Sequence, residues 1–441
     1  MTSSTILKAA VPPEAVLEFI EPGADIIMPN ANGEPVELVD TLELHAGELQ
    51  GVRIHQMHAL RERRYISGEF GDRLRHVSYF LAPATRQAYQ AGKCELMPNH
   101  FSEVPELLRR HTKCSLVIAA ASPPNHHGYF SLGTNCDYTA SLIGRVPFFL
   151  ESNQQMPRTF GANQVHISQV VGWTEVDYPL VEAHTIVPTD TDQAIAALVA
   201  ERLPDGATLQ AGIGGMPNAL LAMLKGHKEL GVHTELLSDG VIDLAEAGVV
   251  TGVHKKFRRG KIVTTLALGS QRLYDFLHEN SAVDFAPVDW VNDPGVIARE
   301  PNFVAINATT EVDFYGQCAS ETVAGRYFSS SGGQYDFSRG AMYSENGQAF
   351  IVLQSSTRDG SISKIRPTLS PGSVVTTSKN TVDKIVTEFG VAEMRGRTVR
   401  ERVLGLIAIA HPKFREELEQ RAQEMNYLSR QFAGVEVLRP S

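Results

Sequence analysis

Short apolar runs alternate along the chain with longer segments of helical periodicity, and this alternation limits the fold more than any other feature. The apolar runs are flanked by turn residues and are short enough to be buried parallel strands. They are residues 117–120, 303–306, 350–353 and 374–377. Helical periodicity marks residues 217–225 and 399–410, and a charged helix follows to about residue 425. The pattern predicts an open α/β fold with mostly parallel sheets.

Two pairs of similar segments repeat in the same order. Gly23-Ala-Asp-Ile-Ile resembles Gly206-Ala-Thr-Leu-Gln, and Asn125-His-His-Gly128 resembles Asp313-Phe-Tyr-Gly316. The chain has 441 residues, which is enough for two or three domains. We therefore expect two related α/β domains, at residues 1–187 and 188–441.

The composition is that of an ordinary globular protein, with 43% hydrophobic and 20% charged residues. Its net charge of −10 repels phosphate backbones, so a nucleic acid partner is not expected. No segment is typical of a signal peptide or a membrane anchor, which predicts a cytoplasmic protein with no membrane partner. The cysteines stand far apart, as reduced and mostly buried thiols would; they are Cys94, Cys114, Cys136 and Cys318.

The first candidate for chemistry is a glycine-rich turn between an apolar run and a helical segment. It contains Gly212, Gly214, Gly215 and Met216, and Pro217 stands in the first turn of the expected helix. Backbone N–H groups at such a turn point toward a phosphate or an oxyanion. The turn lacks the glycine pattern of a dinucleotide site and the lysine of a phosphate loop. A tight turn that only packs a helix on a sheet is the alternative.

The second candidate is a set of carboxylates about 20 residues further on. Glu235 stands near the end of a short apolar run, where open α/β sheets bind ligands. It can act as a base or as a nucleophile. Asp239 and Asp243 are competitors, although Asp239 precedes a glycine in a turn and Asp243 can cap a helix or face solvent.

A third candidate comprises residues 307–317 and 329–340, and the small residues at 329–333 let its backbone approach a ligand closely. A surface loop is the alternative. His126 and His127 are neighbours and therefore point in different directions on a strand, and no carboxylate spacing accompanies them. We expect no metal site.

Taken together, these segments resemble the acetyl-CoA hydrolase/transferase family of class I CoA-transferases, which includes 4-hydroxybutyrate, butyryl and succinyl CoA-transferases. The resemblance covers residues from about 206 to 425, with a looser match at 122–129. The strings that carry it are residues 212–217, 233–240, 307–317, 332–340, 387–390 and 408–412.

The resemblance implies two α/β domains of common ancestry with an active site in the cleft between them. It implies Glu235 as the nucleophile, with oxyanion donors at Gly215 and Met216 and at Gly332 or Gly333. The implied residues for binding substrate or CoA are Gly212, Gly214, Asn292 and Gln334. Asn218 departs from the aspartate that several relatives carry, and we expect no effect on the chemistry.

The implied activity is ping-pong transfer of CoA between a short-chain acyl-CoA and a carboxylic acid such as acetate, through a glutamyl-CoA thioester. Coenzyme A is then a substrate, no bound cofactor is needed, and a homodimer or larger homo-oligomer is expected. Two alternatives remain at this point: an acyl-CoA hydrolase on the same scaffold, and a non-catalytic α/β protein that binds a metabolite. The identity of the acids is not determined by spacing.

Overall fold

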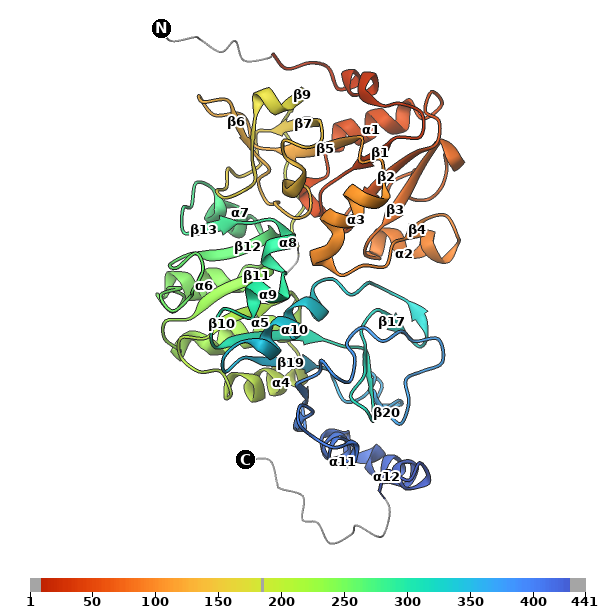
Figure 1. The fold of residues 1–441 in the computed structure, drawn as a ribbon, viewed down its shortest axis with the longest axis vertical. Helices are drawn as coiled ribbons and strands as arrows, with labels where there is room; N and C mark the ends of the chain where they lie inside the picture. Colours follow the sequence, from red (N-terminus) through yellow and green to blue (C-terminus); the bar gives the residue numbers. More distant parts are fainter. Residues whose placement is uncertain (1–8, 184–185, 429–441) are drawn as a thin grey trace. The chain divides into compact units, whose positions relative to one another are not determined.

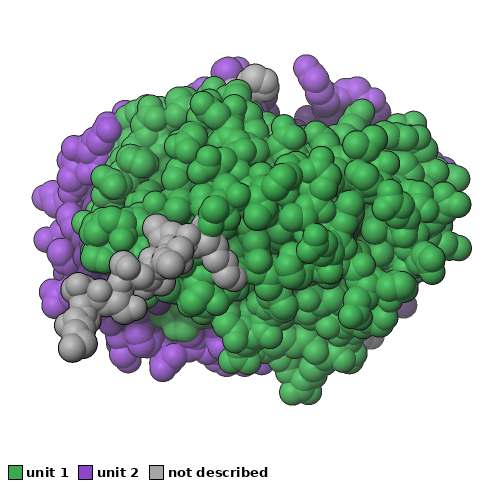
Figure 2. Space-filling model, turned by 90° about the horizontal axis from the view of Figure 1, so that it is seen from above, with its two compact units in different colours: residues 1–184, 234–242, 261–292 green, residues 185–233, 243–260, 293–441 purple. Residues whose placement is uncertain are grey.

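The computed structural model describes residues 9–183 and 186–428 and divides the chain into two compact units, which are coloured separately in Figure 2. The first unit is made of residues 1–184, 234–242 and 261–292. The second unit is made of residues 185–233, 243–260 and 293–441. The units are therefore interleaved along the sequence, and the division at residues 187/188 stays a prediction.

The first unit contains a seven-stranded sheet whose neighbouring strands all pair in parallel. Its strand order is β4-β3-β2-β1-β5-β7-β9 (Figure 1). The strands are β1 (Asp25–Ile27), β2 (Val52–Gln56), β3 (Leu74–Ser78), β4 (Glu95–Leu96), β5 (Leu116–Ala121), β7 (Phe148–Asn153) and β9 (Val170–Val176). Every residue of β5 is buried, as expected for a central strand with neighbours on both sides.

A second sheet has eight strands in the order β13-β12-β11-β10-β14-β19-β21-β22. They are β10 (Thr208–Ala211), β11 (Gly231–Leu237), β12 (Ile262–Ala267), β13 (Val283–Phe285), β14 (Phe303–Ala308), β19 (Gln348–Val352), β21 (Lys384–Thr387) and β22 (Gly390–Glu393). β22 pairs antiparallel with β21 at one edge. β11 starts in the second unit, and its residues from Thr234 onward belong to the first.

The first seven positions of the two sheets follow the same order along the chain: in each sheet the central strand comes first, three strands follow on one side, and then three on the other. This shared order explains the repeat in the sequence. Gly23-Ala-Asp-Ile-Ile runs into β1 and Gly206-Ala-Thr-Leu-Gln runs into β10, which are the corresponding central strands. The expected α/β fold with large, mainly parallel sheets is confirmed.

Helices flank both sheets, and those expected from periodicity are present. The first unit has α1 (Val36–Leu44), α2 (Pro83–Gln90), α3 (Val104–His111), α7 (Gln271–Leu277) and α8 (Val288–Val291). The second unit has α4 (Asp190–Ala200), α5 (Gly215–Met223), α9 (Pro294–Ile297), α10 (Gln334–Tyr343), α11 (Val399–Ile409) and α12 (Arg415–Glu424), and α6 (Gly240–Glu246) spans the boundary. In the described ranges, no helix is both long and apolar enough to cross a membrane.

One expected strand is absent. Residues 374–377 form no strand, and Thr377 makes only an isolated bridge to Cys318. Val375 is 44% exposed whereas Thr376 and Thr377 are buried, so the run is a loop that packs against the second unit with its last two residues. β-Propensity depends on packing against neighbouring strands, and among the described residues this segment has only that one bridge.

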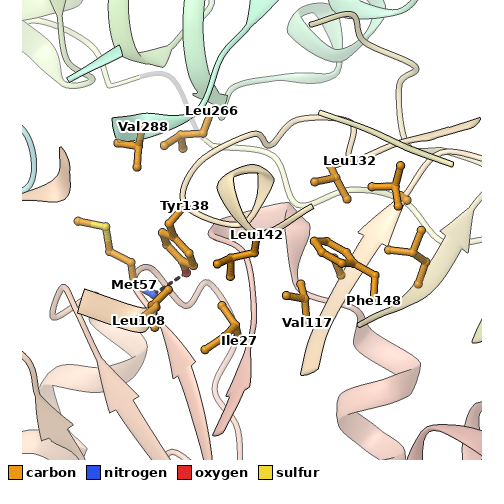
Figure 3. Packing of buried hydrophobic residues seen from close by; sticks show 14 of the residues in the cluster. Ile27, Met57, Leu108, Val117, Leu132, Tyr138, Leu142, Phe148, Leu266 and Val288 are labelled. Atoms are coloured by element: carbon orange, nitrogen blue, oxygen red, sulfur yellow. Dashed lines mark hydrogen bonds between the residues drawn. The ribbon is translucent and has the colours of Figure 1, made fainter. Parts of the chain in front are cut away.

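The core of the first unit reaches beyond its seven-stranded sheet. Val117 and Phe148 from the sheet pack in one cluster with Leu266 of β12 and Val288 of α8 (Figure 3). Tyr138 lies in this cluster, and its hydroxyl accepts a hydrogen bond from the backbone N–H of Met57 at 3.1 Å. The segments that follow residue 188 therefore complete the core of the first unit.

Candidate active site

Glu235, the predicted nucleophile, is half-buried in β11, within the part of that strand that belongs to the first unit. Its carboxylate Oε2 accepts a hydrogen bond from the side-chain amide of Asn292 at 2.8 Å. The hydroxyl of Thr264 in β12 donates to the backbone carbonyl of Glu235 at 3.2 Å. The structure thus brings together two predicted site residues that are 57 positions apart in the sequence.

Asn292 is held at a junction between two short helices. It ends α8, and its backbone N–H donates to the carbonyl of Val288 at 2.9 Å. Asp293 follows directly and caps α9 by accepting from the N–H of Val296. The side chain of Asn292 is fully buried, and its Oδ1 has no hydrogen-bond partner among the described residues. A buried amide oxygen without a donor lowers the stability of the fold. Such an atom is often found where a bound ligand supplies the missing donor.

The two competing carboxylates have structural partners instead. The carboxylate of Asp239 accepts from the backbone N–H of Ser270 at 3.0 Å and from the hydroxyl of the same serine. Asp243 lies in the first turn of α6 and is 3.3 Å from the ammonium of Lys225. The contacts therefore favour Glu235 as the reactive carboxylate.

The glycine-rich turn lies in the second unit, between β10 and α5. Gly214 precedes α5 with φ at +133° and ψ at 178°, a conformation that only glycine adopts readily. A Cβ at Gly215 would lie 2.6 Å from the carboxylate of Asp192, so this glycine lets α5 pack closely on α4. A Cβ at Gly212, in contrast, would have no atom within 4 Å. The N-cap residue of α5 is Gly214, which has no side chain to accept from the first N–H groups of the helix.

The serine- and glycine-rich segment lies in the same unit and leads into α10. Gly332 and Gly333 are buried, and Gly332 has φ at +52°. Gly333 is the N-cap residue of α10 and provides no side-chain cap. Gln334 starts the helix, and its amide Nε2 donates to the hydroxyl of Thr377 at 3.1 Å. The segment is thus a packed turn at a helix N-terminus, where backbone N–H groups can face an anion.

The glycine-rich turn occupies a defined place in the second sheet. The chain continues from β10 to β11 on one side, and β14 lies on the other side. In open α/β sheets, ligands bind at the carboxyl ends of such a pair of strands, where the order reverses. We call the carboxyl ends of β10 and β14 the second switch point, and those of β1 and β5 the first switch point.

At the first switch point, residues 132–139, which we call the plug, are hydrogen-bonded to the segment that follows β1. Asp137 of the plug is fully buried and accepts hydrogen bonds from the backbone N–H of Asn30, the amide of Asn135, and both the backbone N–H and the hydroxyl of Thr139. Burial raises the pKa of Asp137, and these donors oppose that rise. The plug also pairs with β12, where the N–H of Cys136 donates to the carbonyl of Thr265 at 2.8 Å.

Other titratable groups on the carboxyl side of the first sheet are also structural. Glu151 of β7 accepts from the backbone N–H of Leu38 at the start of α1 and from the hydroxyl of Tyr178. Burial raises the pKa of Glu151 to about 7. The ring of His58 stacks on Phe80 at 5.6 Å, and desolvation lowers its pKa to about 4, so this imidazole is neutral at pH 7.

The histidine pair dismissed as a metal site lies on the surface. The rings of His126 and His127 are exposed, with centroids 3.7 Å apart. Across the described residues, no group of three or more histidine, cysteine, aspartate or glutamate side chains is placed to hold a metal ion. Cys94, Cys136 and Cys318 are buried and Cys114 is half-buried, all with free thiols.

Two family domains cover most of the sequence. The acetyl-CoA hydrolase/transferase N-terminal domain matches residues 5–189, and the acetyl-CoA hydrolase/transferase C-terminal domain matches residues 269–422. The chain therefore belongs to the acetyl-CoA hydrolase/transferase family.

Named relatives and solved structures agree with this assignment. The chain is 42% identical to a succinyl-CoA:cyclohexane-1-carboxylate CoA transferase of Geobacter metallireducens, over 95% of this chain and 96% of that protein. It is 39% identical to a 4-hydroxybutyrate coenzyme A transferase of Clostridium kluyveri, over 92% and 95%. The crystal structure of RipA from Yersinia pestis, 35% identical, matches with a TM-score of 0.90 over 95% and 98%. The chain is an enzyme of the CoA transferase class.

Proposed function

We propose that the enzyme moves CoA between a short-chain acyl-CoA and a carboxylic acid such as acetate, with Glu235 as the covalent nucleophile. The observation that carries the proposal is the hydrogen bond from buried Asn292 to the half-buried carboxylate of Glu235. The relatives named above act on succinyl-CoA with cyclohexane-1-carboxylate and on 4-hydroxybutyrate, so small aliphatic acids are the first to test.

The first half-reaction passes through an anhydride and ends at a glutamyl-CoA thioester. The carboxylate of Glu235 attacks the thioester carbonyl of the acyl-CoA, and the CoA thiolate leaves. The thiolate then attacks the glutamyl carbonyl, which releases the carboxylic acid and leaves a glutamyl-CoA thioester. A second carboxylate reverses these steps with CoA as the transferred group. The thioester bond is exchanged rather than hydrolysed, so the scheme needs no ATP.

A carboxylate is a weak nucleophile, and most of the acceleration must come from its surroundings. Asn292 orients Glu235 by binding Oε2. Backbone N–H groups of Gly215 and Met216, and of Gly332 or Gly333, are the proposed donors to the oxyanion, and one such donor contributes roughly 3–4 kcal/mol to the transition state in comparable sites. Gly212, Gly214 and Gln334 are the proposed contacts to substrate or CoA.

The test is chemical trapping of the intermediate. After mixing with acyl-CoA, borohydride should reduce the thioester at Glu235, and peptide mass spectrometry should find the reduced residue there. Glu235→Ala should lower transfer by several orders of magnitude while the melting temperature stays near that of the parent enzyme. A reduced residue at Asp239 or Asp243 would reassign the nucleophile, and Asp243→Ala is the matched control.

Assays with and without an acceptor acid distinguish transfer from hydrolysis. A transferase makes the new acyl-CoA without net loss of thioester, whereas a hydrolase releases free CoA when no acid is added. We expect exchange to exceed release. We also propose a cytoplasmic homodimer or larger homo-oligomer, which sedimentation velocity of the purified enzyme would test.

A further inference from the structure

The second unit carries a carboxylate and three exposed apolar side chains beside the segment that leads to Gly332 and Gly333, and the mechanism above does not use them. Glu321 is half-buried, and its Oε1 accepts from the hydroxyl of Thr376 at 3.0 Å. Within the described chain, its other carboxylate oxygen has no hydrogen-bond partner. Burial raises the pKa of Glu321, and the hydrogen bond from Thr376 opposes that rise.

The apolar side chains come from segments that are bonded to Glu321 or lie next to it. Val323 is 48% exposed, Phe328 42% and Val375 44%. Val323 lies in the hairpin formed by β17 (Thr322–Val323) and β18 (Arg326–Tyr327), directly after Glu321. The backbone N–H of Phe328 donates to the carbonyl of Glu321 at 2.8 Å, and Val375 precedes the threonine that binds the Glu321 carboxylate.

This group is continuous with the proposed oxyanion segment. The backbone N–H of Ser329 also donates to the carbonyl of Glu321, at 3.1 Å. Ser330 follows and is only 5% exposed. Its hydroxyl has no hydrogen-bond partner in the described ranges. Gly332 and Gly333 come next. Glu321 thus holds the start of the short segment whose end is proposed to bind the thioester oxygen.

We propose that Glu321, Val323, Phe328 and Val375 form a subsite for the pantetheine arm of the CoA thioester; this rests on the proposed function. The pantetheine arm carries two secondary amides, whose N–H groups need acceptors, and methyl and methylene groups that apolar side chains can cover. A carboxylate accepts such N–H groups strongly. It repels the phosphates of the nucleotide and the carboxylate of the acid substrate, so neither of those fits this position as well.

The experiment compares acyl-CoA with the corresponding S-acyl-pantetheine, which lacks the nucleotide. Glu321→Ala should lower kcat/KM about tenfold for both donors, because the lost acceptor faces the part that they share. Glu321→Gln keeps one carbonyl acceptor and should lower it only about threefold. Val375→Ser should also lower kcat/KM for both donors. Glu345→Ala, an exposed carboxylate of the same unit, is the control and should change neither value.

The outcomes separate this proposal from the proposed function. If Glu321→Ala lowers kcat/KM for acyl-CoA but not for S-acyl-pantetheine, the nucleotide occupies the subsite and the assignment is wrong. If both values stay within twofold of the parent enzyme while Glu235→Ala abolishes transfer, the subsite is refuted and the mechanism stands. If transfer survives Glu235→Ala, the mechanism fails whatever Glu321 does. Melting temperatures should be equal among the variants, which excludes misfolding as the cause.

Discussion

The two switch points have the same place in sheets of the same strand order, but different kinds of residues lie at them. At the first, the plug makes a buried polar network centred on Asp137. At the second, the chain supplies glycines, and Gly212 has open space where a Cβ would be. The same topology can therefore be used for stability in one half and left available for a ligand in the other.

The difference shows that the position at the carboxyl edge does not by itself assign a function. Asp137 and Glu151 are acidic residues of the first unit in that region, yet their carboxylates accept hydrogen bonds from groups of the fold. What distinguishes Glu235 is a partner, Asn292, whose own amide oxygen is left without a donor. The hydrogen-bond partners of each carboxylate therefore say more about its role than its position in the fold does.

The largest effect should come from breaking the plug. Asp137→Ala leaves four donor groups from Asn30, Asn135 and Thr139 without their acceptor, so the free energy of unfolding should fall by about 4 kcal/mol. Chemical denaturation measures this. Asp72→Ala removes a carboxylate that is 96% exposed and should change stability by less than about 0.5 kcal/mol. An Asp137 variant as stable as the Asp72 variant would show that the plug does not stabilise the first unit.

The second switch point should respond in activity more than the first. Gly214→Ala forces a side chain into a conformation with φ at +133°, which displaces the turn, so kcat/KM should fall roughly 100-fold. Gly212→Ala is the matched control for stability, because its Cβ meets no atom within 4 Å. It should leave the melting temperature unchanged and raise KM for acyl-CoA only severalfold. Full activity in both variants would mean that the turn is only a packing element.

The smallest effect expected is a pH dependence of stability in the first unit. The pKa of Glu151 rises from 4.5 to about 7 on folding, so the folded chain binds this proton more tightly than the unfolded chain does. The contribution is fully present below pH 4.5 and is lost as pH rises through 7. In the parent enzyme, this group should lower the free energy of unfolding by about 2 kcal/mol between pH 5 and 8. Glu151→Gln should remove that decrease. Parallel slopes for the variant and the parent, measured by urea denaturation, would contradict this origin.

Much of the fold could be predicted from local patterns. β5, β14 and β19 are apolar runs bounded by turn residues, and α5, α11 and α12 follow their periodicity. Residues 374–377 were expected as a strand for the same reason, but their β-branched side chains lie in a loop. A local run cannot indicate whether a neighbouring strand is available, because strand pairing is set by distant segments.

The candidate site was only partly accessible from the sequence. The glycine-rich turn and Glu235 have local signals, namely the glycine spacing and a carboxylate in an apolar run. The choice of Glu235 over Asp239 and Asp243 rests on the family resemblance and stays a prediction, since the three carboxylates are chemically alike. Glu321 had no signal of its own, because its relation to residues 328–333 is made by backbone hydrogen bonds across the hairpin.

The interleaving of the two units limits where the chain can be divided into fragments that fold. A fragment that ended near residue 187 would lack Leu236, Leu266 and Val288, and would expose the apolar surface that they cover around Phe148 and Tyr138. Such a half-length product should aggregate when made alone. Gene fission, or exchange of one half with a homologue, would therefore require both pieces to be synthesised together and to assemble by fragment complementation.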